Sequence, residues 1–383
     1  MSEPRVLVLH NRYRVHGGEE RAVDLHLSAL VSAGVKHRAL MRDSSQVGRV
    51  QAATGMLRGG ADPDEIGRAA RELGATVVHA HNIQPLLGPR ALAAGRAAGA
   101  RTVLHLHNFR LFCAIGVAFR LGEPCFRCHH GRTFPGFVLN CRGSLPEAAV
   151  YAAALSHQLG PVLDSVDRFV TPSAYLAGQI ARLGVPKDRV EALPHYLPDE
   201  AFADSSVAHE GRFALVGGRL SPEKGVDLAI DAATAAGVPL QVAGAGPEEE
   251  ALRAHAAASG GQVEFLGRLT PERLAVIRRA AAVVLMPSRS DESFGLAALE
   301  AMGAGVPVIA TRAGALPELV GDERCVERGD ADALAARLAD LWADPEGRRK
   351  EGDELIARAR GRYSERRFTE QLLAMYESLV ASP

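Results

Sequence analysis

The sequence contains no apolar run long enough to cross a bilayer, and it is poor in aromatic residues. In the first segment, MSEPRVLVLHNRY, a four-residue apolar run precedes His10, which is too short for a signal peptide. Aromatic residues make up 5% of the chain. With no arginine-rich run and no aromatic–basic stripe, the sequence argues against a nucleic-acid partner. These features predict a cytoplasmic protein that can also work peripherally at the inner membrane surface.

Cysteine is scarce as well, with five residues in the chain, yet four of them fall close together. The spacing C-x11-C-x2-C-x12-C is formed by Cys113, Cys125, Cys128 and Cys141. One C-x2-C pair with two outlying thiols predicts a structural zinc site that holds a long loop, with four unligated thiols as the alternative. Cys325 stands alone and is expected to be a small buried hydrophobe.

What is present indicates two globular domains. The chain has 383 residues, of which 47% are hydrophobic and 23% charged. Residues 1–195 hold 23 Lys and Arg against 15 Asp and Glu, whereas the remainder holds 21 against 30. A positive first half favours an anionic substrate, a lipid headgroup or a phosphate. The alternative is simple attraction between the two halves.

Short apolar runs alternate with helical patterns in both halves, which is typical of parallel βαβ units. We expect an α/β fold with two Rossmann-like, doubly wound parallel sheets facing each other across a cleft, and ligands at the carboxyl ends of the strands. The expected parts are a first domain over 1–195 with a cysteine-rich loop at 108–142, a second domain over 196–362, and a helix at 363–383 that can pack back on the first domain.

Two cations and two acids stand out in the second half. In VGGRLSPEKGVDLAI, Arg219 and Lys224 follow a strand and precede a helix, where cations suit a diphosphate. The alternative is a surface loop with two solvated bases. In RSDESFGLAALEAMGAGVPVIA, Glu292 precedes a helix and can accept hydrogen bonds from sugar hydroxyls, while Glu300 lies inside that helix. The alternative is that Glu292 caps the helix and Glu300 forms a buried ion pair.

The start of the same helix provides a further anion site. The backbone amides of Phe294, Gly295 and Leu296 are expected to form a positive helix end for phosphate.

With SFGL, G-VPVIAT and GRLSPEKG around them, these acids and bases resemble the donor half of the retaining glycosyltransferases of family 4, which adopt the GT-B fold. The resemblance covers nearly the whole chain. It implies that Arg219 and Lys224 hold the diphosphate of a nucleotide sugar, that Glu292 holds donor-sugar hydroxyls and that Glu300 holds the ribose. The backbone near Arg268 is expected to contact the base.

In the first half, HNRYRVHGGEERAV places Gly17 and Gly18 after the first strand. The resemblance implies that this pair lies against the donor phosphate and the transferred sugar; a flexible turn is the alternative. The strands VVHAHN and VLHLHN each end in two histidines that point to one face. We expect one of each pair to pack inside and the other to reach the cleft. His107 matches the family's active-site histidine.

Two other motifs are weaker. Gly244 and Gly246 fit the start of a dinucleotide-binding loop, but Glu249 stands at the third glycine position, so we interpret the segment as an ordinary turn. The D-x-D patterns at 62–64 and 330–332 follow no strand, so no catalytic metal is expected.

The sequence therefore predicts a retaining glycosyltransferase that moves a sugar from a nucleotide-diphosphate sugar to an acceptor hydroxyl, with a UDP-sugar favoured over a GDP-sugar. A sugar-nucleotide epimerase of the same fold and a non-catalytic sugar-nucleotide-binding scaffold are the alternatives.

Overall fold

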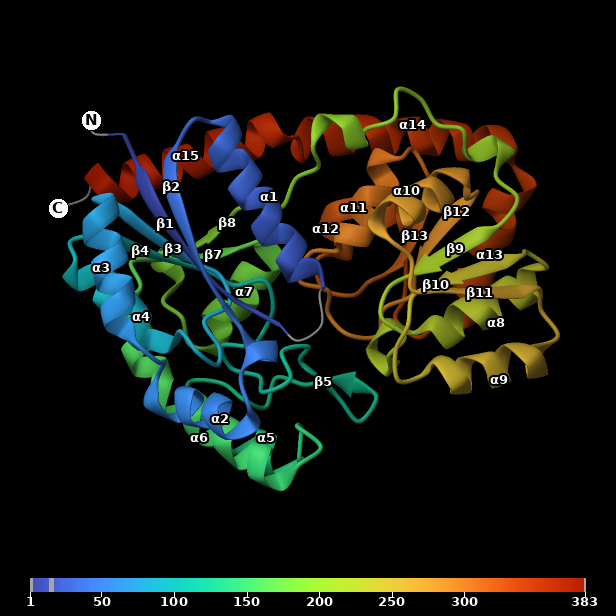
Figure 1. The fold of residues 1–383 in the computed structure, drawn as a ribbon. Coiled ribbons are helices and arrows are strands. Elements are labelled where there is room, and N and C mark those ends of the chain that lie inside the picture. Colours follow the sequence, from blue (N-terminus) through green and yellow to red (C-terminus); the bar gives the residue numbers. More distant parts are fainter. Residues whose placement is uncertain (1–2, 14–16, 382–383) are drawn as a thin grey trace. The chain divides into compact units, whose positions relative to one another are not determined.

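The computed structural model describes residues 3–13 and 17–381, which form two compact units. The first unit contains the described residues up to Ala118, residues Cys125–His195, and the carboxyl-terminal helix from Arg366 onward. The second unit contains Tyr196–Glu365 together with Phe119–Pro124. Each sheet is covered by helices on both faces (Figure 1).

The first unit is built on a parallel six-stranded sheet in the order β2-β1-β3-β4-β7-β8. Its strands are β1 (Arg5–Arg12), β2 (Lys36–Asp43), β3 (Val77–Ala80), β4 (Arg101–His105), β7 (Arg168–Thr171) and β8 (Val190–Ala192). In this order the chain reverses direction across the sheet between β1 and β3. The loops after those two strands therefore line the position at which doubly wound sheets bind ligands.

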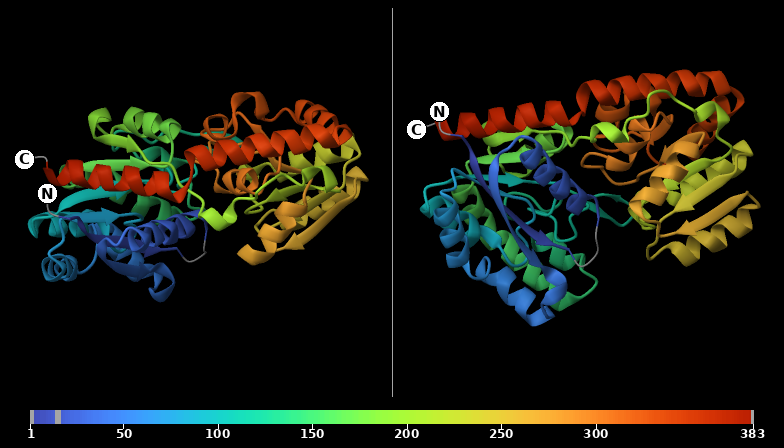
Figure 2. Two further views of the ribbon diagram at one scale, coloured as in Figure 1. Left: turned by 90° about the horizontal axis from the view of Figure 1, so that it is seen from above. Right: turned by 45° about the horizontal axis from the view of Figure 1, so that its top comes forward.

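Eight helices surround this sheet within the described residues, and the last of them comes from the far end of the chain. They are α1 (Gly18–Ser32), α2 (Arg49–Arg58), α3 (Pro63–Leu73), α4 (Gly88–Ala97), α5 (Phe134–Val138), α6 (Leu145–Ser165), α7 (Ala174–Leu183) and α15 (Glu365–Ala381). Helix α15, in red, runs along the first unit in both views of Figure 2. Its buried side chains include Phe368, Leu372 and Tyr376, so an apolar stripe attaches it to this unit.

The second unit has a parallel sheet in the order β11-β10-β9-β12-β13-β14. Its strands are β9 (Ala214–Gly217), β10 (Leu240–Ala243), β11 (Val263–Gly267), β12 (Val283–Met286), β13 (Val308–Thr311) and β14 (Cys325–Val326). Its helices are α8 (Val226–Ala236), α9 (Glu249–Ser259), α10 (Pro271–Ala280), α11 (Leu296–Gly303), α12 (Leu316–Val320), α13 (Ala331–Ala343) and α14 (Pro345–Arg362). A hairpin of β5 (Phe119–Arg120) and β6 (Glu123–Pro124) groups with this unit.

Alternation along the strands divides the core of the second unit into two layers. On β12, Val283 and Leu285 belong to one apolar cluster, while Val284 and Met286 belong to the other. Because successive strand residues point to opposite faces, a continuous apolar run is what a parallel sheet covered on both faces requires. Among the described residues, no helix is long and apolar enough to cross a membrane.

The loop after β10 shows why glycines stand in VAGAGPEEE. Gly244 has φ +146, and a Cβ at this position would lie 1.8 Å from the carbonyl oxygen of Gly218. A Cβ on Gly246 would lie 2.1 Å from the carbonyl oxygen of Leu220. Gly244 and Gly246 are therefore explained by the close approach of the loop after β9. A bound dinucleotide is not needed to account for them.

We expect Gly244→Ala to lower the free energy of unfolding of the protein by at least about 3 kcal/mol, because left-handed strain and a backbone collision add. Gly237→Ala is the matched control: its φ is +65, and nothing lies within 4 Å of an added Cβ. The control should lose only about 1 kcal/mol. Urea unfolding of both variants measures the difference, and equal losses would contradict the collision.

Candidate functional site

The second unit gathers its predicted donor residues at the carboxyl ends of two neighbouring strands. Strands β9 and β12 pair directly, although β10 and β11 lie between them in the chain. This is the reversal point of the sheet, where such folds bind ligands. Arg219 and Lys224 lie in the loop after β9, and Glu292 lies in the loop after β12. The structure thus brings together residues that are about seventy positions apart.

Lys224 and Glu292 form the central contact of this group. The Lys224 Nζ atom lies 2.6 Å from Glu292 Oε1, and the Ser288 hydroxyl donates to the same oxygen at 2.6 Å. Burial by itself raises the pKa of Glu292, but the charge of Lys224 and the two hydrogen bonds outweigh it and hold the pKa below its usual value. Glu292 is therefore ionised at neutral pH and fixes the Lys224 ammonium at the strand ends.

Arg219 is held in a similar way. Its guanidinium forms an ion pair with Glu223 and donates to the Ser221 hydroxyl at 3.2 Å. The Glu223 carbonyl accepts hydrogen bonds from the backbone amides of Arg289 and Ser290, at 2.8 and 3.2 Å. The two loops that carry the cations and the acid are thus joined through their backbones as well as through Lys224.

The backbone of Glu292 is fixed on its other side. Glu292 forms a bridge with Gly314, and the amide of Ala315 donates to the Glu292 carbonyl at 2.9 Å. A Cβ on Gly314 would lie 2.3 Å from that carbonyl oxygen. Only glycine permits this approach, so the carboxylate is held on a rigid backbone.

The remaining residues predicted to bind the donor differ in burial and in their partners. Glu300, inside α11, forms an ion pair with Arg278 of α10, which is the alternative that the sequence left open. Arg268 is exposed immediately after β11. Phe294 is buried in the core, Gly295 is the N-cap of α11 with φ +102, and Leu296 is its first residue.

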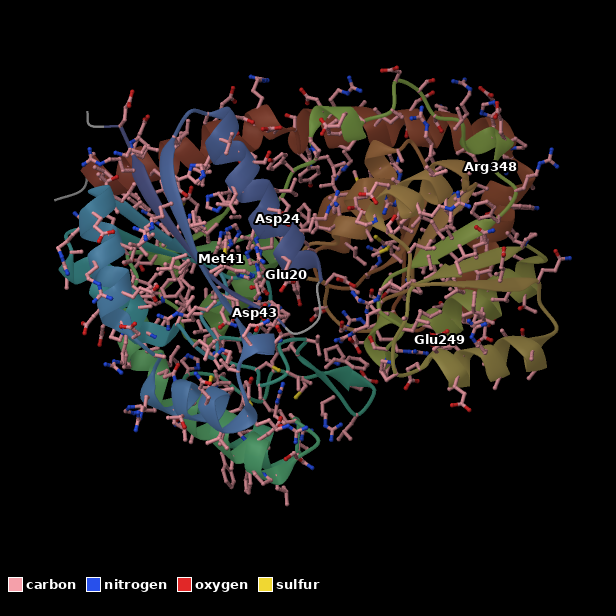
Figure 3. The ribbon with its side chains drawn as sticks, in the orientation of Figure 1. Glu20, Asp24, Met41, Asp43, Glu249 and Arg348 are labelled. Atoms are coloured by element: carbon pink, nitrogen blue, oxygen red, sulfur yellow. The ribbon has the colours of Figure 1, made fainter. Side chains whose placement is uncertain are left out.

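In the first unit, the loop after β1 is held by Glu20. Its carboxylate accepts from the backbone amides of Tyr13 and Gly17, each at 3.0 Å (Figure 3 labels Glu20). Gly17 has φ −148, which any residue adopts, and an added Cβ would make only ordinary contact, 3.9 Å from Glu20 Oε2. The described fold therefore does not itself require glycine at position 17. Gly18 begins α1.

The histidines that end β3 and β4 form one buried cluster. His79, His81, His105 and His107 are 0, 2, 2 and 8% exposed, and the last three line a small cavity. That one member of each pair reaches the cleft stays a prediction. The rings of His105 and His107 stack with centroids 4.2 Å apart. Burial lowers the pKa of all four imidazoles well below 6.5, so they are neutral at pH 7.

Sequence reasoning missed a polar group beside His107. Tyr13, Glu19, Asn108 and Arg110 line a cavity of about 30 Å³ together with histidines of the cluster. The Tyr13 hydroxyl and the Asn108 amide both donate to Glu19 Oε2, at 2.8 Å. Burial raises the pKa of Glu19 to about 7, although these hydrogen bonds act against it. A carboxyl directly after a Gly-Gly pair was the signal available, and it does not reveal the cavity.

The cysteines and histidines differ in their fit to a metal. Within the described part of the chain, two sets of three histidines place their ring nitrogens within 4.8 Å of one another. They are His26, His79 and His81, and His81, His105 and His107. No three of Cys113, Cys125, Cys128 and Cys141 meet that limit among the residues described. Tetrahedral Zn–S bonds of about 2.3 Å need sulfurs closer than this. Burial raises the pKa of Cys128 to about 11, and zinc at this loop stays a prediction.

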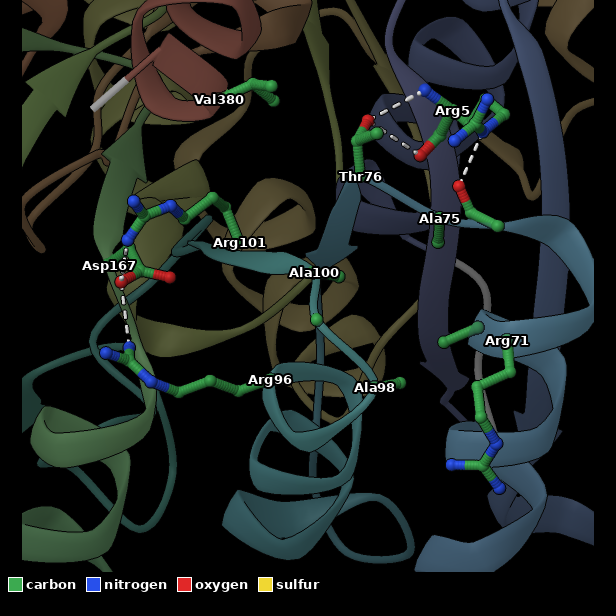
Figure 4. A pocket seen from close by; sticks show the side chains of 13 residues that line it. Arg5, Arg71, Ala75, Thr76, Arg96, Ala98, Ala100, Arg101, Asp167 and Val380 are labelled. Atoms are coloured by element: carbon green, nitrogen blue, oxygen red, sulfur yellow. Dashed lines mark hydrogen bonds and ion pairs between the residues drawn. The ribbon is translucent and has the colours of Figure 1, made fainter. Parts of the chain in front are cut away.

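A larger pocket lies at the opposite end of the first sheet. Its volume is about 690 Å³, and Figure 4 shows its lining at the amino ends of the strands. Asp167 pairs there with Arg96 and Arg101, and Arg5 Nε donates to the Gly74 carbonyl at 2.5 Å. These arginines thus have structural partners, and the pocket is far along the strands from the predicted ligand end.

Two doubly wound parallel sheets, each with polar groups at its reversal point, are the architecture of the GT-B class of enzymes, and comparisons agree with that class. The family described as glycosyl transferase 4-like domain matches residues 3–195, and the family described as glycosyl transferases group 1 matches residues 199–361. The chain therefore belongs to the group 1 glycosyltransferases and is a transferase.

Two curated glycosyltransferases are similar in sequence to parts of this chain. A D-inositol 3-phosphate glycosyltransferase of Segniliparus rotundus is 29% identical over 312 residues, covering 75% of this chain and 68% of that protein. An MMP α-(1→4)-mannosyltransferase of Mycolicibacterium hassiacum is 40% identical over 117 residues, covering 30% of this chain and 28% of that protein.

Two solved structures share the fold over nearly the full length. Anabaena HepE in complex with UDP has a TM-score of 0.69 and 17% identity, covering 98% of this chain and 100% of that one. Sucrose-phosphate synthase of Thermosynechococcus elongatus has a TM-score of 0.70 and 20% identity, with both chains fully covered.

Lys224→Met should destabilise the protein most at neutral pH, by about 2 kcal/mol, because it leaves the Glu292 carboxylate without its cation. The folded pKa of Glu292 is lowered in the wild type, so its stabilisation is present above the ordinary pKa of 4.5 and is lost as pH falls below it. The difference between variant and wild type should therefore shrink in acid. Urea unfolding at a series of pH values measures it.

The control for this prediction is Arg366→Met, which removes an exposed ion pair with Glu370. It should cost less than about 0.5 kcal/mol at any pH. The assigned ion pair would be contradicted if the loss of unfolding free energy in Lys224→Met became larger in acid.

Proposed function

We propose that the protein transfers a sugar from a nucleotide-diphosphate sugar to an acceptor hydroxyl and retains the anomeric configuration. The observation that carries the proposal is the group of Arg219, Lys224 and Glu292 at the carboxyl ends of β9 and β12. Two cations held there by carboxylates are ready for a diphosphate before it arrives. Preorganised charge of this kind stabilises a leaving group without rearrangement during the reaction.

The donor-side roles follow from these contacts. Lys224 and Arg219 neutralise the diphosphate as the bond to the sugar breaks. Both hydrogen bonds to the Glu292 carboxylate end on Oε1, which leaves Oε2 for the hydroxyls of the donor sugar. The amides of Phe294, Gly295 and Leu296 add the positive start of α11. Glu300 holds the ribose beside its Arg278 partner, and the backbone near Arg268 contacts the base.

On the first unit, Gly17 and Gly18 lie against the donor phosphate and sugar, and His107 binds the transferred sugar. The residues that the structure describes do not require glycine at position 17, and the close approach of a ligand to the backbone is a reason for it. The donor is a UDP-sugar, as in the relative crystallised with UDP-glucose. The departing phosphate takes the acceptor proton, and no catalytic metal takes part.

The acceptor is an anionic molecule with a free hydroxyl. The excess of Lys and Arg over Asp and Glu in residues 1–195 favours such a molecule. The relative that acts on D-inositol 3-phosphate supports the same choice. A lipid headgroup at the inner membrane surface would meet this requirement too.

Lys224→Ala should lower the turnover number for sugar transfer by at least about a hundredfold, because it removes one charge at the leaving group. Lys350→Ala is the control, since Lys350 is exposed on α14. Release of UDP from UDP-glucose with an inositol phosphate acceptor measures both. Near-normal turnover in Lys224→Ala would remove the diphosphate assignment. Epimerised donor in the absence of any acceptor would favour the epimerase.

A thermal-shift comparison identifies the donor base. UDP at about a hundred times its Kd should stabilise the protein by about 2.7 kcal/mol, which corresponds to a rise of several degrees in Tm. GDP at the same concentration should give a smaller rise. A larger shift with GDP would replace the proposed UDP-sugar by a GDP-sugar.

A further inference from the structure

The buried histidines of the first unit are joined to one tyrosine hydroxyl by an unbroken set of hydrogen bonds. This histidine network consists of Tyr376, His26, His79, His81, His105 and His107. Tyr376 lies on α15 and is 0% exposed. It is the junction from which two branches start, one through His26 and one through His79.

The long branch contains three rings. The Tyr376 hydroxyl lies 2.9 Å from His26 Nε2, and His26 Nδ1 lies 2.8 Å from His81 Nε2. His81 Nδ1 then lies 2.8 Å from His107 Nε2. The described residues provide no hydrogen-bond partner for the last atom, His107 Nδ1, which is buried.

The short branch contains two rings. The Tyr376 hydroxyl lies 2.7 Å from His79 Nδ1, and His79 Nε2 lies 3.3 Å from His105 Nδ1. The far atom, His105 Nε2, is likewise buried without a hydrogen-bond partner in the part of the chain that is described. Each branch thus ends on one open nitrogen.

Proton counting restricts this network to two states. A neutral imidazole has one N–H and one lone pair, and a tyrosine hydroxyl has one proton to donate. If Tyr376 donates to His26, every ring of both branches must carry its proton on Nδ1. If Tyr376 donates to His79 instead, every ring must carry its proton on Nε2. A network with both tautomers would place two protons, or none, between one pair of nitrogens. Otherwise it would leave the buried Tyr376 hydroxyl without an acceptor.

The two open ends consequently have opposite character. In the first state His107 Nδ1 is a donor and His105 Nε2 an acceptor, and in the second state the roles are exchanged. The rings of these two histidines stack and line the same cavity of about 30 Å³. That space is enough for a group of the size of a water or a hydroxyl. A hydroxyl both donates and accepts, so it matches one donor and one acceptor in either state.

We propose that the histidine network is a proton-ordered binding site for one hydroxyl group, and that Tyr376 is a positioning residue which couples the tautomer of His107 to that of His105. The hydroxyl belongs to a sugar substrate if the proposed function holds. The coupling itself follows from the hydrogen bonds and does not depend on that function.

The two tautomeric states require every imidazole of the network to be neutral, and burial favours the neutral form. Burial lowers the pKa of His26 to about 3. Burial also raises the pKa of Tyr376 well above its usual value, so the hydroxyl keeps its proton. His195, which stacks on His107, is held neutral in the same way, with a pKa of about 3.

Selective ¹⁵N labelling of histidine and nitrogen chemical shifts measure the tautomers in the intact protein. The wild type should show one common tautomer for all five network rings, either Nδ1–H or Nε2–H, and each ring is assigned by a His→Gln variant. In Tyr376→Phe the junction is lost, so the two branches should no longer be tied to the same tautomer. Tyr175→Phe, which removes a hydroxyl bonded to Gln179, should leave the common tautomer unchanged.

Mixed tautomers in the wild type would overturn the proposal, and so would an unchanged pattern in a folded Tyr376→Phe protein. Tight binding of Zn²⁺ to the wild type that is lost in His81→Gln would also overturn it, because the ion would take the lone pairs that the network shares. Sugar transfer is measured separately. If transfer is absent while the tautomers remain common, the proposed function fails and the network stands.

Discussion

The contact between Lys224 and Glu292 joins the two loops on which the donor-side residues depend. It connects the end of β9 to the end of β12, and Ser288 and the backbone of Glu223 strengthen the same connection. Burial by itself would raise the pKa of Glu292, but the charge of Lys224 outweighs it and keeps the carboxylate ionised at neutral pH. A charged pair in this position is costly unless each member is hydrogen-bonded, and here both are. Gly314 lets its own backbone lie against the backbone of Glu292, which holds the acid of this pair in place.

The two units differ in the kind of polar group that stands at their strand ends. The second unit places full charges at its sheet reversal point and neutralises them in pairs. The first unit places neutral imidazoles at its strand ends and connects them through hydrogen bonds to Tyr376. Charges suit a diphosphate, whose own charge is large, whereas neutral rings suit hydroxyl groups. Under the proposed function, this division matches the chemistry of a nucleotide sugar, which has an anionic leaving group and a sugar rich in hydroxyls.

Much of the fold could be predicted from local sequence. The apolar runs at 5–10, 76–81, 102–107 and 167–173 indicate strands, and β1, β3, β4 and β7 each lie within two or three residues of them. The helical pattern at 271–280 has the same bounds as α10. The edge strand β2 was missed because KHRALMRD alternates only weakly and is half exposed. Helix α6 was missed because Pro161 lies inside it, and an internal proline ordinarily ends a helical pattern. The last helix was expected to begin at residue 363 and begins two residues later, at Glu365.

The sequence by itself determined which charged residues form the proposed donor group, because Arg219, Lys224 and Glu292 lie in motifs that follow strands, and parallel strands end at one edge. Only the tertiary structure decided which partner each charged group takes. Glu300 pairs with Arg278, and Lys224 with Glu292, through contacts that no spacing in the chain specifies. The histidine network is the clearest case. Its junction, Tyr376, lies 297 residues from His79, and it meets the strand ends only because an apolar stripe attaches α15 to the first unit. Local patterns encode periodicity and turn chemistry, whereas contacts between distant segments depend on how the whole core packs.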